Sequence, residues 1–189
     1  EENVVKVEKV VEYEETFDDN ANQWDVFNTM VASAEIKDGK YQIENKRRRG
    51  LHFVFNEYEF LHDSDFTIEV YIRNERKSKG AYGFALGAND ALNNHVILID
   101  NKKFDLIRNR NGVPKKLTSV EIGRDIIKTR SFNRLKIEKN DSNLRLYIND
   151  FFILEILNIS FDGDKIGFVV GGRSKISVEK MRSQTKSYQ

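Results

Sequence analysis

Hydrophobic and polar residues alternate along most of this chain, in short runs that are separated by turn-forming residues. In the clearest run, residues 65–73, every second side chain is strongly apolar: Phe66, Ile68, Val70 and Ile72. Successive side chains of a strand point to opposite faces, so this run predicts a strand with one buried and one solvated face. Residues 134–138 and 143–149 alternate in the same way, and the Lys139-Asn140-Asp141-Ser142 segment between them predicts a β-hairpin.

Similar runs, spaced roughly every 8 to 12 residues as in all-β domains, predict a two-sheet antiparallel β-sandwich of about 12–14 strands with little helix. Near residues 123–129, Ile122, Ile126 and Ile127 follow helical spacing, which indicates one helical turn, although a loop explains the segment equally well. The other predicted strands lie at residues 13–17, 31–37, 40–46, 51–55, 81–88, 94–100, 103–109, 115–121, 151–157, 165–170 and 174–182.

The length of 189 residues favours one domain with a single core. Residues 13–182 carry the alternating pattern and predict the sandwich, with Trp24 and most of the 13 phenylalanines in its core. Residues 1–12 form a leader or linker, in which the valines at positions 4, 7, 10 and 11 fit either a helical face or a strand. Residues 183–189 lack an apolar pattern, which predicts a disordered tail.

Charged residues are balanced, because 31 Lys and Arg stand against 30 Asp and Glu. Such a chain has no overall field to attract nucleic acid, and no apolar run approaches the roughly 18 residues that span a bilayer, so neither partner is expected. The absence of cysteine excludes disulfides and thiolate chemistry. Because the chain begins at Glu1 without a start Met, we expect a mature or trimmed fragment, with a slight preference for a secreted, periplasmic or cell-surface location; the oligomeric state is left open.

Several segments occur in an order that resembles a known fold family. They are Glu15-Thr16-Phe17-Asp18-Asp19-Asn20, Trp24, residues 36–41, residues 65–70, Tyr82-Gly83-Phe84-Ala85-Leu86-Gly87, residues 95–99, residues 133–137 and residues 146–149. Over residues 13–182 their order resembles the concanavalin A-like, laminin G-type jelly roll, nearest to the bacterial DUF1080 (3-keto-disaccharide hydrolase-like) branch. The resemblance implies two curved sheets, with a concave sheet on which relatives bind glycans or proteins, although fold likeness alone does not establish a function.

Catalytic residues are not expected. Relatives that hydrolyse β-glucans carry a Glu-x-Asp-x-x-Glu strand whose carboxylates share one face, and this chain has no such triplet. Glu69 is the one acidic residue inside the strand at 66–72, and a lone carboxylate cannot divide the nucleophile and acid roles between two groups.

A ligand-binding face is predicted beside a smooth floor formed by Ala81, Gly83, Ala85 and Gly87, where a ligand or a covering loop would approach the backbone closely. Arg108 would fork two sugar hydroxyls, and Tyr71 would stack on a sugar ring. A histidine at position 95 would also stack, although an ordinary surface histidine explains it too. The predicted ligand-binding residues are Glu69, Tyr71, His95 and Arg108.

No metal or other cofactor is expected, because the three histidines, His52, His62 and His95, lack the spacing of a zinc site. Calcium remains an alternative, since hard oxygen ligands gather in one segment: Asp18, Asp19, Asn20, Asn22 and Asp25. Residues 46–49, Lys-Arg-Arg-Arg, form the densest charge run. Nucleic acid or a sulfated glycan would need such a patch, but a solvated strand end that protects a sheet edge is the favoured interpretation.

Three functions compete on these observations. The favoured one is a non-catalytic module of a larger protein, which binds a carbohydrate or a protein surface, because the acid pair is missing. The second is a glycoside hydrolase of the DUF1080-like kind. The third is a structural or assembly domain, joined to a partner through the leader.

Overall fold

The computed structural model describes residues 8–56, 64–75, 80–100, 102–123, 125–129 and 131–188. Within these residues the chain forms strands β1 to β15, and none of them belongs to a helix. The strands are β1 Glu8–Glu15, β2 Phe27–Asn28, β3 Ala32–Ile36, β4 Tyr41–Asn45, β5 Leu51–Asn56, β6 Asp65–Asn74, β7 Tyr82–Asp90, β8 Asn93–Ile99, β9 Lys103–Arg110, β10 Val113–Glu121, β11 Asn133–Asn140, β12 Asn143–Ile148, β13 Phe151–Ile156, β14 Lys165–Gly171 and β15 Lys175–Tyr188.

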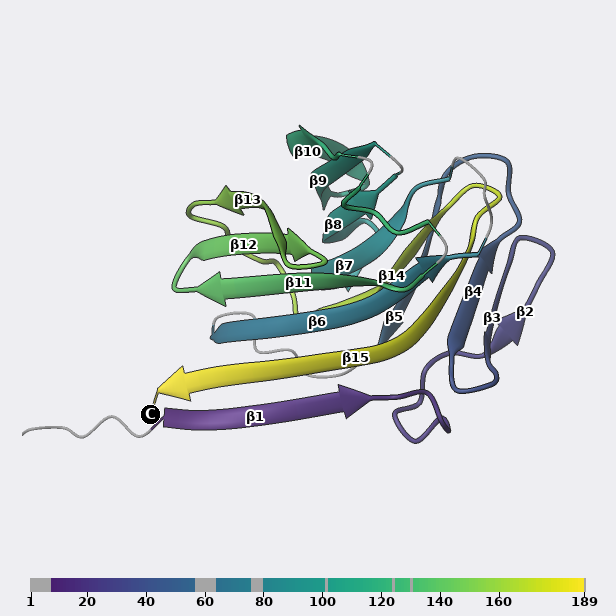
Figure 1. The fold of residues 1–189 in the computed structure, drawn as a ribbon, viewed down its shortest axis with the longest axis horizontal. Helices are drawn as coiled ribbons and strands as arrows, with labels where there is room; N and C mark the ends of the chain where they lie inside the picture. Colours follow the sequence, from purple (N-terminus) through teal and green to yellow (C-terminus); the bar gives the residue numbers. More distant parts are fainter. Residues whose placement is uncertain are drawn as a thin grey trace, which may run out of the picture.

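The strands form two antiparallel sheets that are layered on each other, as Figure 1 shows. Sheet A has the order β13-β12-β11-β6-β15-β4-β3-β2, with β1 also paired to β15, and sheet B has the order β10-β9-β8-β7-β14-β5. The predicted all-β, two-sheet antiparallel sandwich is confirmed. The hairpin predicted from two alternating runs is formed by β11 and β12.

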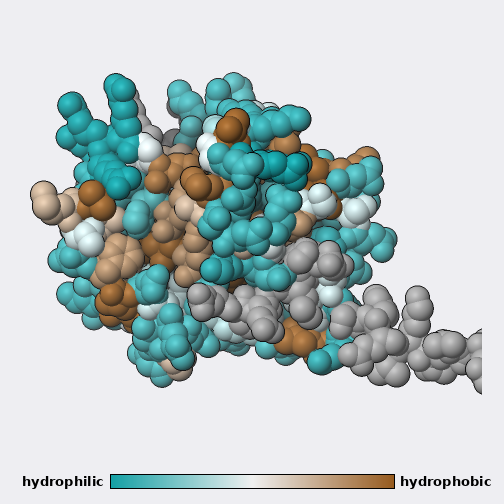
Figure 2. All heavy atoms as spheres, turned by 180° about the vertical axis from the view of Figure 1, so that it is seen from behind, coloured by the Kyte–Doolittle hydropathy of each residue, from teal (hydrophilic) through white to brown (hydrophobic). Residues whose placement is uncertain are grey.

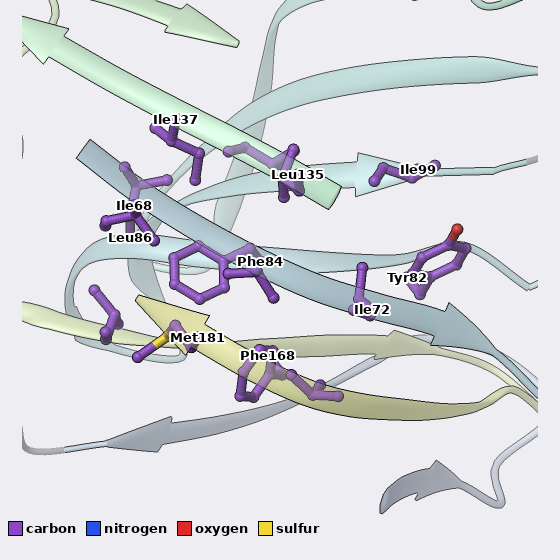
Figure 3. Packing of buried hydrophobic residues seen from close by; sticks show 14 of the residues in the cluster. Ile68, Ile72, Tyr82, Phe84, Leu86, Ile99, Leu135, Ile137, Phe168 and Met181 are labelled. Carbon is purple, nitrogen blue, oxygen red and sulfur yellow. The ribbon is translucent and has the colours of Figure 1, made fainter. Parts of the chain in front are cut away.

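Inward-facing side chains of the central strands fill the space between the sheets. Figure 3 shows Ile68 and Ile72 of β6 in the same cluster as Phe84 of β7 and Phe168 of β14, and all four side chains are 0% exposed. Burying one such side chain contributes roughly 1.5–3 kcal/mol. The alternation along β6 therefore fixes which face of this strand meets sheet B.

The two ends of the chain pair with each other, which corrects two expectations. Strand β1 pairs along its whole length with the second half of β15. Residues 8–12 are thus part of sheet A, whereas residues 1–7 of the expected leader lie outside the described residues. The disordered tail predicted from residue 183 onward is wrong for residues 183–188. Ser183 and Thr185 are 5% and 4% exposed, so small polar side chains occupy inward positions that are apolar in other strands.

The segment at 123–129, where a helical turn and a loop were both open, forms turns in its described part. The backbone N–H of Ile126 donates to the carbonyl of Gly123 at 3.1 Å. A search of the described residues for a helix long and apolar enough to cross a membrane finds none.

Candidate functional site

A groove of about 660 Å³ runs beside β5, the strand at one end of sheet B. This volume is within the range of roughly 300–1,000 Å³ that small-molecule sites occupy in proteins. One wall is β5 and the other is the loop at residues 16–26, which connects β1 to β2. We call this feature the β5 groove; the described residues that line it are Tyr13, Ala21, Asn22, Gln23, Asp25, Phe27, Phe53, Val54, Phe55, Asn56 and Lys165.

The β5 wall is aromatic. Val54 and Asn56 point into the sandwich and are 3% and 6% exposed, so the alternating Phe53 and Phe55 stand on the outer face of sheet B. Their rings are nearly parallel, with an interplanar angle of 13° and centroids 5.8 Å apart. Figure 2 shows hydrophobic side chains gathered on this side of the molecule, between hydrophilic margins. The groove therefore has one apolar wall.

The opposite wall is held in place by Glu15, the last residue of β1, which is 4% exposed. Its carboxylate accepts hydrogen bonds from the backbone N–H of Phe17 at 2.7 Å and from the side-chain amide of Asn22 at 2.7 Å. The indole N–H of Trp24 donates to the same carboxylate at 3.1 Å. A buried carboxylate is stable only when donors surround it, and here those donors are parts of the loop itself. Glu15 therefore fixes the path of the loop.

Aromatic packing holds this loop against the core. Trp24 is 1% exposed, and its ring lies 5.0 Å from that of Phe168, between centroids. The hydroxyl of Tyr41 donates to the carbonyl of Asp25 at 2.6 Å. Burial, and secondly the Asp25 carboxylate, raise the pKa of Tyr41 above its usual range, so this hydroxyl stays protonated and keeps donating.

Polar groups of the loop line the groove together with the phenyl rings. Gln23 and Asp25 are exposed, and their side chains take part in no hydrogen bond or ion pair found among the described residues. The side-chain amide of Asn56 donates to the carbonyl of Asn22 at 2.9 Å, which joins the two walls. A molecule in the groove would thus meet an amide and a carboxylate on one side and flat apolar rings on the other.

The four residues predicted to bind a ligand fall into two separate pairs, the first of which lies on β6. Glu69 and Tyr71 face outward from sheet A, where Arg134 of β11 lies 3.6 Å from Glu69 and also interacts with Tyr71. Glu69 lines a second hollow, of about 530 Å³. Other charges there are paired too, as Glu14 is with Arg182 at 3.2 Å. Because these charged side chains form ion pairs with one another, this outer face of sheet A offers a ligand few polar groups that lack a partner.

His95 and Arg108, the second pair, are cross-strand neighbours on β8 and β9. His95 is 1% exposed, and its ring meets that of Phe161 edge-on with centroids 5.1 Å apart. Burial, and secondly the charge of Arg108, lower the pKa of His95 to about 4, so its imidazole is neutral at pH 7. The structure does not bring the four residues to one face, and their part in ligand binding stays a prediction.

The two glycines of the smooth floor on β7 each stand against a close neighbour. A Cβ atom added to Gly83 would overlap the carbonyl oxygen of Ile97 on the neighbouring strand β8. A Cβ atom on Gly167 of β14 would overlap the carbonyl oxygen of Val54 on β5 in the same way. Glycine at these positions lets adjacent backbones of sheet B approach each other closely. A Cβ atom on Gly87, a second floor residue, would instead overlap the side chain of Phe161, which packs over this end of β7.

The oxygen-rich segment considered for calcium uses most of its side chains in local hydrogen bonds, Asp25 excepted. Asp18 accepts a hydrogen bond from the hydroxyl of Thr16 at 2.8 Å, and Asp19 accepts one from the backbone N–H of Ala21 at 2.8 Å. No group of three His, Asp or Glu side chains that could hold a metal is found in the described part of the chain. His52 packs against Phe27 with ring centroids 5.6 Å apart, whereas His62 lies outside the described residues.

Sequence reasoning missed the β5 groove, because it assigned most of the phenylalanines to the core. A usable signal was present in residues 51–56, where Phe53 and Phe55 alternate with Val54 and Asn56. One of these two sets has to face outward in any strand. The contribution of the loop could not be found in this way, since its approach to β5 depends on Glu15.

No family model matches the chain, and no curated protein matches it. Solved structures do. A protein of unknown function with a galectin-like fold from Bacillus subtilis superimposes with a TM-score of 0.71 at 12% identity, covering 96% of this chain and 99% of the other. The β-glucanase of Bacillus licheniformis gives a TM-score of 0.67 at 11% identity, covering 91% and 97%. A carbohydrate-binding module from Bacillus subtilis gives 0.54 at 18% identity, covering 88% and 94%.

At these identities the likeness shows the fold alone. The chain has a jelly-roll fold of the concanavalin A-like and galectin-like kind, as the sequence resemblance implied. Solved proteins with this fold include carbohydrate-binding modules as well as glucanases.

Proposed function

We propose that this chain is a non-catalytic carbohydrate-binding module of a larger protein, with the β5 groove as its binding site. The observation that carries the proposal is that the two walls of the groove differ in character. One wall has the nearly parallel rings of Phe53 and Phe55, and the other has the side chains of Gln23 and Asp25, which have no partner among the described residues. A sugar has the same two characters, because its ring carries an apolar C–H face and a rim of hydroxyl groups. The rings take the apolar face, and the amide and carboxylate take the hydroxyls.

Binding is favoured over hydrolysis by the number of carboxylates. Glycoside hydrolysis of the common kind needs two carboxyl groups on either side of the scissile bond. Asp25 is the one carboxylate among the described residues that line the groove. Glu15 lies behind the loop with its oxygens occupied by donors, so it does not supply the second group.

Glycan-array screening followed by calorimetry tests the proposal. Removing either ring, by Phe53→Ala or Phe55→Ala, is expected to weaken binding of the selected glycan about tenfold, since an aromatic contact contributes on the order of 1 kcal/mol or more. The matched control is Phe152→Ala, because Phe152 is 57% exposed on β13 of the other sheet. Circular dichroism melting checks that all three variants remain folded. Equal affinity in the groove variants and the control would refute the assignment.

The likeness to a β-glucanase and the resemblance to DUF1080-like hydrolases support a second outcome, in which the groove cleaves a glycoside. Asp25 would be its acidic group. Release of reducing sugar from 3-keto and ordinary glycosides, lost in Asp25→Asn, would establish this activity. Binding without release in the same assay supports the module.

A further inference from the structure

The turn between β4 and β5 presents three arginines whose side chains have no partner within the described part of the chain. Arg47, Arg48 and Arg49 are all exposed, and no hydrogen bond or ion pair found among the described residues involves their guanidinium groups. Figure 2 shows hydrophilic side chains projecting at the upper left, in the region of this turn. Elsewhere charges are commonly paired, as Arg145 is with Glu155 at 2.9 Å and Arg73 with Glu75 at 2.6 Å. The net charge of +1 therefore hides a local concentration of positive charge.

The turn is held rigidly. Asn45 is 0% exposed, and its side-chain amide donates to the carbonyl of Val170 at 2.9 Å and to that of Gly50 at 3.2 Å. Its side-chain oxygen accepts the backbone N–H of Arg47 at 3.1 Å. Lys46, the remaining basic residue of the run, donates to Asn28 at 2.7 Å and to the carbonyl of Thr29 at 2.8 Å. Lys46 thus holds the turn through its hydrogen bonds, whereas Arg47, Arg48 and Arg49 are exposed.

A second turn, from the far end of the chain, adds to the same surface. The backbone N–H of Arg173, between β14 and β15, donates to the carbonyl of Arg47 at 2.8 Å. A Cβ atom on the preceding Gly172 would come within 2.6 Å of the carbonyl oxygen of Arg48, so the two turns lie in close contact. Arg173 is exposed like the three arginines of the first turn. We call Arg47, Arg48, Arg49 and Arg173 the basic tip.

The basic tip lies at the start of β5, and the β5 groove lies beside the same strand. Strand β5 begins at Leu51, directly after the turn, and carries Phe53 and Phe55. At about 3.3 Å per residue, the distance from Arg49 to Phe55 along the strand is roughly 20 Å. An extended chain of several sugars that lies along β5 would therefore contact both features.

We infer that the ligand is an acidic polysaccharide, whose carboxylate or sulfate groups bind the basic tip while a sugar ring occupies the β5 groove. The inference rests on the proposed function, since it names the class of glycan. Guanidinium groups match the planar oxygens of carboxylates and sulfates with two parallel hydrogen bonds. Nucleic acid is disfavoured, because proteins that bind it present a long basic stripe to its backbone, whereas outside the tip acidic residues outnumber basic ones in this chain.

The test compares dextran sulfate and polygalacturonate with unmodified dextran by calorimetry, at low and at physiological salt. Replacing three arginines together, Arg47→Gln, Arg48→Gln and Arg49→Gln, is expected to reduce affinity for the acidic glycans about tenfold or more and to flatten its salt dependence. The matched control is the triple variant Lys9→Gln, Lys102→Gln and Lys115→Gln, which removes the same charge from exposed positions on β1, just before β9 and on β10. Melting curves confirm that both variants fold.

The outcomes separate this inference from the proposed function. Equal losses in the two triple variants, or no preference for acidic over neutral glycans, would overturn the inference. Binding of a neutral glycan that depends on Phe53 would in that case leave the proposed function standing. Binding of acidic glycans that depends on the arginines but not on Phe53 would support the basic tip and count against the β5 groove. Displacement of the acidic glycan by duplex DNA at equal charge concentration would overturn the choice of ligand class.

Discussion

Acid is expected to weaken this fold through His95, the buried imidazole of β8. In the folded protein, burial and the neighbouring charge of Arg108 lower the pKa of His95 from 6.5 to about 4. In the unfolded chain the same imidazole regains its ordinary value. Between these two pH values the unfolded state binds a proton that the folded state does not, so stability falls as the pH falls.

The magnitude follows from the gap between the two pKa values. At roughly 1.4 kcal/mol per pH unit, the gap between 6.5 and about 4 gives about 3 kcal/mol. The full stability is present above pH 6.5, it declines down to pH 4, and below that value His95 adds no further loss. This loss is a sizeable part of the roughly 5–15 kcal/mol that stabilises a typical domain.

Urea unfolding of the wild type and of His95→Phe, across pH 7 to 4, measures the effect. Phenylalanine keeps a flat ring beside Phe161 and removes the buried Nδ1 atom that lacks a hydrogen bond. Acidic residues such as Asp105 titrate in both proteins, so their contribution cancels in the difference. The wild type is expected to lose about 3 kcal/mol more than the variant over this range. The reasoning would be refuted if the free energies of unfolding of the two proteins changed in parallel with pH, or if an NMR titration placed the pKa of His95 near 6.5.

Three further predictions concern the groove wall, the close approach of strands in sheet B and the chain ends. Glu15→Ala leaves three donors without an acceptor, two of them buried, so urea unfolding should show a loss of about 3 kcal/mol and calorimetry a weaker glycan affinity. Gly83→Ala should cost on the order of 2 kcal/mol because its Cβ overlaps the Ile97 carbonyl, whereas Gly123→Ala, with nothing within 4 Å of its added Cβ, should leave the melting temperature unchanged. Deleting residues 183–189 removes the partner of most of β1 and should lower the melting temperature by roughly 5 °C or more, where a disordered tail would be lost without effect.

The fold could be predicted because most strands bury one face and expose the other. In β6 the apolar side chains are buried and the alternating polar ones are not, and period-two alternation reports this difference directly. The end of β15 escaped prediction because Ser183 and Thr185 face inward, and because β1, which pairs with it, lies at the opposite end of the sequence. No local pattern contains that pairing.

The site was harder to predict for a related reason. Strand β8 has apolar residues on both faces, since Val96 packs on the outer face of sheet B while Ile97 packs in the core. The pattern therefore does not say which way His95 points. The β5 groove requires in addition that Gln23 and Phe53, thirty residues apart in the sequence, be brought together by the contacts of Glu15 and Trp24.

The pairing of β1 with β15 has a mechanical consequence. Glu8 lies opposite Tyr188, so the first and last described residues of the sandwich leave it side by side, as Figure 1 shows at its left edge. A force that pulls these two residues apart breaks the backbone hydrogen bonds between β1 and β15 one after another, instead of loading many of them at the same time. Tension applied at both ends would thus be resisted weakly and would release β1 first, and with it Tyr13, which lines the β5 groove, and Glu15, which holds the loop wall.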